Sequence, residues 1–502
     1  MYELEPDIST GVATLRRRAV RGGAVLALTR LALQALSWAV TIVVARYLRP
    51  FDYGVMSSGA VLLEFADRVA ELGLTRALVR KPQLTDDDLA EAFSLSLLFS
   101  VVAYAVVYAA AGLFGAYFRN EEVQLYLRVA GLLLLLVPFR AVPLAKLEHQ
   151  LLMEKQSALH GAVIVLQSVV SLAFAVTGFG YWALVAGVFA ARLSEVGLLL
   201  GITHWQPRLK IPTATGRYLI HFGLQATTTN LLYSFYSTCD LLVLGRLGGP
   251  VVLGYFTIAS NLVTLPVNKL TANANQILYP ILCRLQHDPA RMRVWYLRFV
   301  GIVGFVGLPV ATGLVLVADD AIPLLLGEKW LPAASLLKIM ALAGAVMIIV
   351  NTLTPIFNVI NRPDINLKYT LACCASLVPA FYVLGRMYGA AGVAGAWTIV
   401  FPLVAGGMVF ATRHLTGIGI PDLFWSLAPT LLALVPMILA VVLVRWILPG
   451  TRPTELVIAE VLAGASAFAV AAYFSGRRSV IRHLGILFAE LRPGTRTEMS
   501  RA

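Results

Sequence analysis

Residues 236–284 read YSTCDLLVLGRLGGPVVLGYFTIASNLVTLPVNKLTANANQILYPILCR, and this stretch decides the fold. Gly249 and Pro250 divide it into two long apolar runs. This division predicts two helices joined by a tight turn, because glycine accepts unusual backbone angles and proline suits the first turn of a helix. Polar residues interrupt both runs, and polar side chains inside membrane helices face a protein interior or a cavity. The stretch therefore predicts a helical hairpin that lines a cavity.

The same framework occurs 200 residues earlier in the chain. Three positions of VARYLRPFDYG (44–54) recur in LGRLGGPVVLG (244–254), and both segments lie between long apolar runs. The matched pairs are Arg46 with Arg246, Pro50 with Pro250, and Gly54 with Gly254. The pattern indicates an internal duplication of roughly 200 residues, in which the second helix pair of each half faces a shared cavity.

The composition is that of a membrane protein. Only 13% of the 502 residues are charged and the mean hydropathy is +0.79, whereas soluble proteins average about 25% charged residues. In a soluble protein the net charge of +13 would suggest a nucleic-acid partner. The four cysteines form no CxxC or Cys/His pattern, so we expect neither a disulfide nor a metal site.

Apolar runs of about 20 residues or more, long enough to cross a bilayer, recur along the chain. If the N-terminus is cytoplasmic and the sides alternate, Lys and Arg residues on the cytoplasmic side outnumber those outside about three to one, in keeping with the positive-inside rule. The basic residues assigned to neither side in this count are Arg30, Arg68, Lys269 and Lys338, which lie within spans. The positive charge thus indicates topology and contact with anionic lipid headgroups, and it excludes a nucleic-acid role. The predicted spans are 22–48, 55–78, 89–117, 122–142, 158–178, 181–203, 216–246, 251–283, 294–318, 332–360, 365–387, 390–412, 424–448 and 454–475.

The sequence thus predicts an all-α integral membrane protein with about 14 transmembrane helices and both termini in the cytoplasm. A shift of 200 residues moves each span by six helices, so the two halves have the same orientation, as in transporters built from parallel repeats. The predicted parts are a cytoplasmic N-terminal segment (1–21), two six-helix lobes (22–210 and 211–414), two extra helices (424–475) and a cytoplasmic basic tail (476–502). We expect the first span to be retained and not cleaved as a signal peptide.

Four stretches carry a family resemblance: VARYLRPFDYG, the central hairpin, LLLGEKWLPAASLLKIMALAG (324–344) and NRPDINLKYT (361–370). The chain resembles the bacterial polysaccharide flippases of the multidrug/oligosaccharidyl-lipid/polysaccharide exporter superfamily. The resemblance implies two bundles that form a V-shaped, alternating-access cavity. It also implies translocation of undecaprenyl-diphosphate-linked oligosaccharide repeat units from the cytoplasmic to the outer leaflet of the bacterial inner membrane, for polysaccharide biosynthesis.

Other functions remain open at this point. An ion-coupled multidrug exporter or a lipid II flippase of the same superfamily would have the same architecture. A membrane glycan polymerase or ligase is disfavoured because such enzymes need a large outside loop, and no Walker loop or catalytic constellation is present. We expect no cofactor, with coupling to H⁺ or Na⁺ left open. The expected partners are a lipid-linked oligosaccharide and membrane lipids, with polysaccharide polymerase machinery as a further candidate, and we expect a monomer.

Three cations within the spans are the candidate diphosphate-binding residues: Arg30, Arg68 and Lys269. An ionisable side chain in a span costs about 2.5–3.5 kcal/mol on insertion scales, which favours a functional role. The resemblance supports the choice, because the related lipid II flippases place cations in spans 1, 2 and 8. Lys269 departs from the arginine expected there, and lysine lacks the guanidinium fork.

Further polar residues are candidates for coupling, gating or sugar contact. Glu64, Asp67, Asp240 and Arg246 are the candidates for ion coupling or gating. The alternatives are internal ion pairs within a lobe for Glu64 and Asp67, and a structural ion pair near the outer end of the seventh span for the other two. Hydroxyl, amide and aromatic groups suited to sugar contact are those of Thr228, Asn230 and Tyr233; hydroxyls bonded to backbone carbonyls are the alternative.

Two local expectations complete the picture. The acidic cluster 86–88 suits the N-terminus of the third helix, where carboxylates complement the helix dipole. Trp330, in the segment Glu328-Lys329-Trp330, is expected to anchor the outside membrane interface, where tryptophan is enriched.

Overall fold

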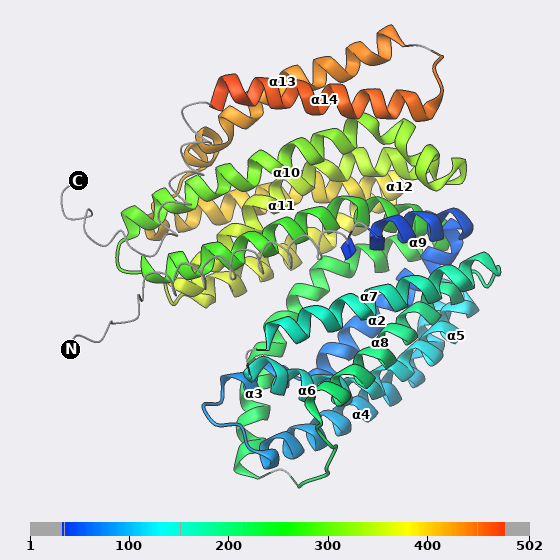
Figure 1. The fold of residues 1–502 in the computed structure, drawn as a ribbon, viewed down its shortest axis with the longest axis vertical. Coiled ribbons are helices and arrows are strands. Elements are labelled where there is room, and N and C mark those ends of the chain that lie inside the picture. The colour runs from blue at the N-terminus through cyan, green and yellow to red at the C-terminus, as the bar shows by residue number, and fades with distance from the viewer. Residues whose placement is uncertain (1–32, 35, 151, 212, 449, 477–502) are drawn as a thin grey trace, which may run out of the picture. The chain divides into compact units, whose positions relative to one another are not determined.

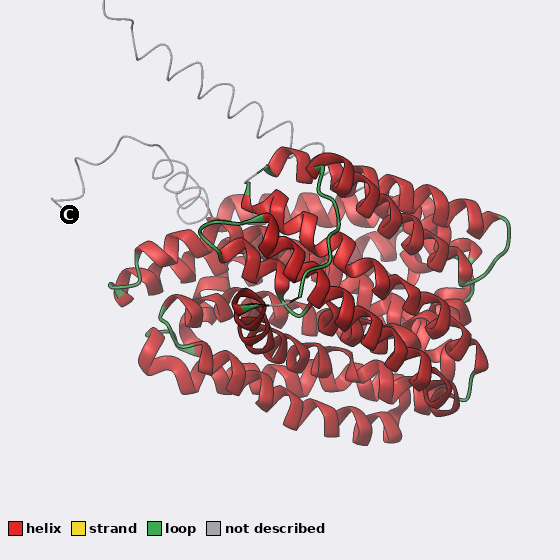
Figure 2. Ribbon diagram, turned by 90° about the horizontal axis from the view of Figure 1, so that it is seen from below, coloured by secondary structure: helices red, strands yellow, loops and turns green. Residues whose placement is uncertain are grey.

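The computed structural model describes residues 33–34, 36–150, 152–211, 213–448 and 450–476. Within these ranges every regular element is a helix, and short loops join the helices (Figure 2). Besides the apolar helix Leu36–Tyr47, the elements are α2 (Pro50–Glu71), α3 (Leu74–Arg80), α4 (Asp86–Phe118), α5 (Glu121–Ala130), the 3₁₀ helix η1 (Gly131–Leu136), α6 (Val137–His149), α7 (Met153–Val176), α8 (Trp182–Thr203), α9 (Ala214–Arg284), α10 (Pro289–Leu326), the 3₁₀ helix η2 (Glu328–Trp330), α11 (Leu331–Val359), α12 (Pro363–Thr416), α13 (Ile420–Ile447) and α14 (Pro453–Gly476).

Ten helices in the described ranges are long and apolar enough to cross a membrane. Two of them, within α9 and α12, are interrupted by a glycine with a non-helical backbone: Gly249 (φ 74°, ψ 179°) and Gly389 (φ 61°, ψ −139°). These interruptions confirm the turns predicted between residues 246 and 251 and between residues 387 and 390. The all-α membrane class is confirmed, and the count of 14 spans stays a prediction.

The described residues form two compact units, which we describe separately. The first contains the described residues of 1–49, 66–111 and 125–227. Its core includes Leu74, Leu78, Phe93 and Trp205, and the rings of Phe93 and Trp205 meet edge to face at 5.4 Å. This core joins α3, α4 and the start of the segment that leads from α8 to α9.

The segment 204–213 is fastened to one face of α4. Glu91, 2% exposed, accepts hydrogen bonds from the Thr213 backbone (3.0 Å), the Thr213 hydroxyl (2.7 Å) and the Gly216 backbone (2.9 Å). Ser94 accepts from the Lys210 backbone at 2.8 Å, and the Lys210 ammonium pairs with Asp87. Glu91 therefore satisfies backbone donors at the start of α9 that the helix itself leaves unpaired.

The start of α4 is capped as expected. Asp86, Asp87 and Asp88 all lie in its first turn. Asp88 accepts from the Thr85 backbone at 3.0 Å, and the Thr85 hydroxyl accepts from the Asp88 backbone at 3.2 Å. This reciprocal pair is a capping box, and Lys81 also pairs with Asp88.

The second unit contains the described residues of 50–65, 112–124 and 228–476, and it brings the duplicated motifs into contact. A Cβ atom added to Gly54 would lie 1.7 Å from the Pro250 carbonyl oxygen, and one added to Gly254 would lie 1.8 Å from that of Pro50. Each glycine thus lets the other copy's proline approach, and the two copies meet face to face.

The C-terminal helices α13 and α14 lie side by side in this unit, at the top of Figure 1. α13 runs beside α10 with a constant offset of 129 residues. Arg293 pairs with Asp422 at 2.7 Å, Ser426 donates to the Leu297 carbonyl at 2.5 Å, and Arg445 donates to the Leu316 carbonyl at 2.8 Å. Arg445 also pairs with Asp320 of α10 and, at 2.6 Å, with Glu460 of α14. The two helices are therefore parallel and fastened at both ends.

One expectation is wrong in this unit. Trp330 does not anchor an interface but is fully buried, with Tyr53 (centroid distance 5.4 Å) and Tyr255 (6.1 Å) edge-on to it. The ring is buried because close aromatic contacts stabilise it more than exposure at the level of the headgroups would.

Candidate functional site

A cavity of about 590 Å³ lies within the second unit. Four helices contribute to its walls: α2, α9 on both sides of Gly249, α11 and α12 on both sides of Gly389. The lining residues are polar or aromatic for the most part. They include Glu64, Tyr233, Tyr236, Ser237, Thr238, Asp240, Ser260, Asn261, Thr264, Asn268, Asn351, Thr354, Asn366, Tyr369, Thr370, Trp397 and Phe401.

A set of side-chain amides links three of these helices on one side of the cavity. The Asn351 side-chain amide donates to the side-chain oxygen of Asn268 at 3.4 Å, and the Asn275 side-chain amide donates to the backbone carbonyl of Asn351 at 2.9 Å. Asn366 donates to Asn358 at 3.1 Å and to the Thr354 carbonyl at 3.2 Å. These bonds hold the amides in place before any ligand binds.

The amide of Asn366 has capacity left for a ligand. Its side-chain oxygen is buried and accepts no hydrogen bond from the described residues. A buried acceptor without a donor costs about 1–3 kcal/mol. A ligand hydroxyl in the cavity would remove that cost, because a hydroxyl donates one hydrogen bond and accepts others.

Among the described residues, two carboxylates line the cavity, and the lining includes no lysine or arginine. Glu64 on α2 accepts a hydrogen bond from the Ser234 hydroxyl at 3.0 Å. Asp240, 4% exposed, accepts from the Trp397 indole N–H at 2.8 Å and from the Leu241 backbone at 2.8 Å. The lining is therefore suited to hydroxyl groups and to cations, and it is poorly suited to a diphosphate.

Aromatic rings form another part of the wall. Tyr233 and Tyr236 meet edge to face at 5.4 Å, and Tyr236 lies 6.4 Å from Trp397. The Tyr233 ring is 48% exposed. Such a ring offers an apolar face together with a polar hydroxyl, which are the two surfaces that a sugar ring also presents.

Comparison with known proteins identifies the family. A family model described as "Polysaccharide biosynthesis protein" matches residues 43–335, more than half of the chain. The chain belongs to this family. The match spans both copies of the duplicated turn and the α2 and α9 residues that line the cavity, whereas the lining residues of α11 and α12 lie beyond the part that defines this polysaccharide biosynthesis protein family.

Relatives agree with the assignment. The lipopolysaccharide biosynthesis protein WzxC of Escherichia coli strain K12 is 23% identical over 400 residues, which cover 77% of this chain and 79% of the relative. The succinoglycan biosynthesis transport protein ExoT of Rhizobium meliloti strain 1021 is 23% identical over 328 residues, which cover 64% of this chain and 65% of the relative. The expected family is thereby confirmed, and the enzyme alternatives find no support.

Two solved structures share the fold. The lipid II flippase MurJ in an inward closed conformation gives a TM-score of 0.74 at 12% identity, covering 90% of this chain and 99% of that chain. A multidrug resistance MATE family transporter of the MOP superfamily in an inward-facing conformation gives 0.59 at 18% identity, covering 80% and 98%. At these identities the likeness shows the fold alone.

Among the predicted site residues of this family member, Glu64, Tyr233 and Asp240 come together around the cavity. Asp240 and Arg246 contact different partners: Asp240 contacts Trp397, whereas Arg246 donates to the Tyr117 carbonyl at 2.9 Å and lies over the Tyr117 ring.

The predicted cations are placed as follows. Arg68, half-buried on α2, belongs to the first unit, whereas Lys269, exposed on α9, belongs to the second. Lys269 directly follows Asn268 of the cavity wall. Arg30 and the side chains of Thr228 and Asn230 lie outside the described residues.

Asp67 belongs to a network of ion pairs in the first unit. It pairs with Arg192 at 3.7 Å, and Arg192 pairs with Glu195 at 3.5 Å. Arg140 pairs with Glu195 at 3.8 Å and with Glu71 at 3.6 Å. The network joins α2, α6 and α8, and this is the alternative described above for Asp67.

Arg192 of this network was not among the candidate site residues predicted from the sequence. It lies in the middle of α8, within the predicted span 181–203. The signal that could have found it is Glu195, three residues later, because an oppositely charged pair at this spacing shares one helix face inside an apolar run.

Proposed function

We propose that this member of the polysaccharide biosynthesis family is a flippase. It moves undecaprenyl-diphosphate-linked oligosaccharide repeat units from the cytoplasmic to the outer leaflet of the bacterial inner membrane, for polysaccharide biosynthesis. Family membership, the names of the relatives and the shared transporter fold support the proposal. The observation that carries it is the cavity lined by amides, hydroxyls and tyrosines within apolar helices.

The physical problem for a flippase is the cost of taking sugar hydroxyls through hydrocarbon. A hydroxyl moved from water into an alkane without a hydrogen bond costs about 4–8 kcal/mol, and a repeat unit carries many. Amides held in place by their neighbours replace water as partners without further ordering of the protein. A largely apolar drug would leave the same amides unsatisfied, which disfavours the multidrug alternative.

We assign the diphosphate to Arg30, Arg68 and Lys269, and not to the residues that line the amide cavity. The negative charge of the cavity lining supports this separation, because carboxylates repel phosphate. Fixed cations offset the desolvation of a diphosphate, and arginine can bind phosphate through two hydrogen bonds. In this proposal the sugars occupy the cavity, with Tyr233, Thr228 and Asn230 among their contacts.

We assign coupling to H⁺ or Na⁺ to the cavity carboxylates. Asp240 supports the assignment, because it is buried, its described partners are neutral N–H groups, and hydroxyl oxygens such as that of Thr238 line the same cavity. We assign Asp67 to holding the helices of the first unit together.

The remaining parts of the proposal concern topology and partners. We propose fourteen spans, two lobes that form a V-shaped alternating-access cavity, and both termini in the cytoplasm. We also propose that the protein is a monomer and passes its product to polysaccharide polymerase machinery.

Deletion of the gene tests the function. We expect loss of one surface glycan and accumulation of its lipid-linked unit on the inner leaflet, both reversed by the wild-type gene. Accumulation of lipid II would favour the lipid II alternative. Intact glycan with increased drug sensitivity would favour the multidrug alternative and overturn the proposal.

A further inference from the structure

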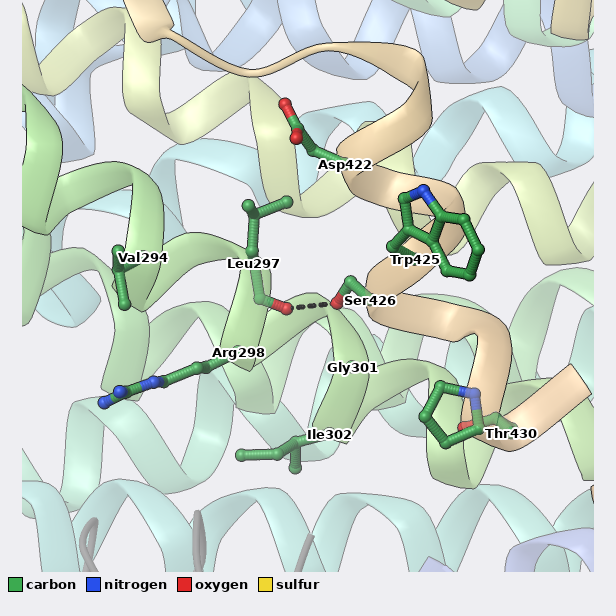
Figure 3. Close-up of a pocket in the computed structure, with 10 residues that line it drawn as sticks. Val294, Leu297, Arg298, Gly301, Ile302, Asp422, Trp425, Ser426 and Thr430 are labelled. Carbon is green, nitrogen blue, oxygen red and sulfur yellow. Dashed lines mark hydrogen bonds between the residues drawn. The ribbon is translucent and has the colours of Figure 1, made fainter. Parts of the chain in front are cut away.

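A second hollow in the second unit lies apart from the amide cavity. It is a groove of about 390 Å³ between α10 and α13, and it shares no lining residue with the cavity (Figure 3). Val294, Leu297, Arg298 and Ile302 line it from α10, and Trp425 and Pro429 line it from α13. The polar groups in its lining are those of Arg298, Asp422, Ser426 and Thr430.

Two tryptophans fix the level of the groove relative to a bilayer. Trp425 is 72% exposed and Trp446 is 79% exposed, although both side chains are large and apolar. They lie 21 residues apart on α13, which corresponds to about 31 Å along a helix and matches a hydrocarbon core of about 30 Å. Tryptophan is enriched at both membrane interfaces, so Trp425 places the groove at headgroup level.

The groove carries one positive charge that is not neutralised by its neighbours. The carboxylate in the lining, Asp422, forms an ion pair with Arg293 at 2.7 Å. Arg298 extends away from Asp422 (Figure 3), and no carboxylate in the described part of the chain pairs with it. A guanidinium at headgroup level beside an apolar channel matches the shape and charge of a phospholipid with a negative head.

The charge at the two ends of α10 indicates which leaflet is involved. Residues 284–298 contain four arginines and one aspartate, whereas residues 319–329 contain two aspartates, one glutamate and one lysine. The positive-inside rule then places the Trp425 end on the cytoplasmic side, whose leaflet carries anionic lipid. The apolar surface continues away from this end through Val306 and Leu432, which are 48% and 67% exposed.

We propose that this groove binds one acidic glycerophospholipid of the cytoplasmic leaflet. Its phosphate contacts Arg298, its glycerol region lies beside Trp425, and one acyl chain follows the channel between α10 and α13. The site is independent of the flipped substrate, because it lies on a different set of residues. A bound lipid would contact both helices at the end where Arg293 and Asp422 join them.

Native mass spectrometry of the full-length protein, titrated with phosphatidylglycerol in detergent, tests the proposal. We expect Arg298→Gln to weaken the tightest bound phosphatidylglycerol about fivefold, the effect of one basic residue near a membrane surface. Arg298→Lys should retain most of the affinity. Arg291→Gln is the matched control and should leave it unchanged, because Arg291 is exposed and paired with Asp288, the N-cap residue of α10.

Three results would overturn the proposal. They are unchanged affinity in Arg298→Gln, equal affinity for phosphatidylcholine, and a bound species with the mass of a polyprenyl phosphate. If Arg298→Gln does not fold, brominated lipid in proteoliposomes gives the answer for the wild-type protein. Brominated phosphatidylglycerol should quench Trp425 fluorescence, taken as the difference from Trp425→Phe, more than brominated phosphatidylcholine does, and equal quenching would overturn the proposal.

Discussion

Thr257 donates a 2.9 Å hydrogen bond to the hydroxyl of Ser57, the residue 200 positions before it. Ser57 in turn donates to the Tyr53 carbonyl at 2.7 Å. With the reciprocal contacts of Gly54 and Gly254, this bond shows that the two copies of the repeat meet each other at equivalent positions. The duplication seen in the sequence is therefore also a packing interface.

Gly54→Ala tests this interface. The added methyl group would overlap the Pro250 carbonyl, which is backbone and cannot rotate away. We expect a loss of about 3 kcal/mol or more in the free energy of unfolding, at the upper end of the cost of overpacking, measured as a lowered Tm in detergent. Gly112→Ala is the control, since nothing lies within 4 Å of its added Cβ, and it should leave Tm unchanged or raise it. Equal Tm values for the two variants would contradict the close approach.

Asn366→Leu tests the sugar role of the amide cavity. The substitution keeps the side-chain size but removes the buried acceptor, so a substrate hydroxyl loses its partner. We expect export of the surface glycan to fall about tenfold, as for one unsatisfied buried hydrogen bond, in a complemented deletion strain with normal protein levels. Asn273→Leu is the control, because Asn273 is exposed on α9 and does not line the cavity. An equal loss in both variants would argue against the site.

Lys269 tests the assignment of the diphosphate. We expect Lys269→Ala to abolish flipping of the lipid-linked unit while the protein still inserts and folds, and Lys269→Arg to retain activity. Lys368→Ala is the control, because Lys368 is 73% exposed and paired with Asp364, and it should flip normally. Retained flipping in Lys269→Ala would remove this residue from the phosphate site.

Substitutions of Arg68 distinguish a phosphate contact from a structural ion pair. Arg68→Ala should also abolish flipping, and Arg68→Lys should lose more activity than Lys269→Arg, because only arginine binds a phosphate through two parallel hydrogen bonds. Glu64 lies four residues before Arg68 on α2, so a purely structural pair is the competing explanation. Restored flipping in the double variant Arg68→Ala, Glu64→Gln would establish that explanation.

Glu91→Gln tests the fastening of the segment that leads into α9. Both backbone N–H groups donate to one oxygen of Glu91, and the Thr213 hydroxyl donates to the other. In the glutamine variant a neutral amide oxygen holds the two backbone donors more weakly than a carboxylate does, and the NH₂ group opposes the hydroxyl donor. We expect a loss of about 2 kcal/mol and faster tryptic cleavage after Arg208 and Lys210. Glu121→Gln, an exposed residue in the first turn of α5, should change neither. Unchanged cleavage in Glu91→Gln would show that other contacts hold the segment.

Local chemistry made much of the fold predictable. Gly249 and Pro250 marked the interruption of α9, because few residues other than glycine accept a positive φ. The interruption of α12 followed from the bounds of the apolar runs 365–387 and 390–412. The acidic run at residues 86–88 marked the start of α4. Apolar length alone predicted the spans. The span predicted at 55–78 is the exception: four charged residues among the last eight of α2 leave this helix outside the ten that are apolar enough to cross a membrane.

The candidate site was predictable only in part. Glu64, Tyr233 and Asp240 stood out as polar groups at apolar depth, and all three line the cavity. Trp397, Asn351 and Asn366 did not, because an indole or amide in an apolar run has no local signal that names its partner. Trp397 reaches Asp240 across 157 residues of sequence, and only tertiary packing creates that contact.

The constant offset between α10 and α13 has a consequence for how the protein is made. Arg293 and Asp320 of α10 enter the membrane before their partners Asp422 and Arg445 have been synthesised. At a synthesis rate of about 5–20 residues per second, an offset of 129 residues means a delay of about 6–26 s. Throughout that delay the Arg293 cation and the Asp320 anion at the two ends of α10 lack the partners that they have in the folded protein, and water and lipid headgroups must solvate them until α13 arrives.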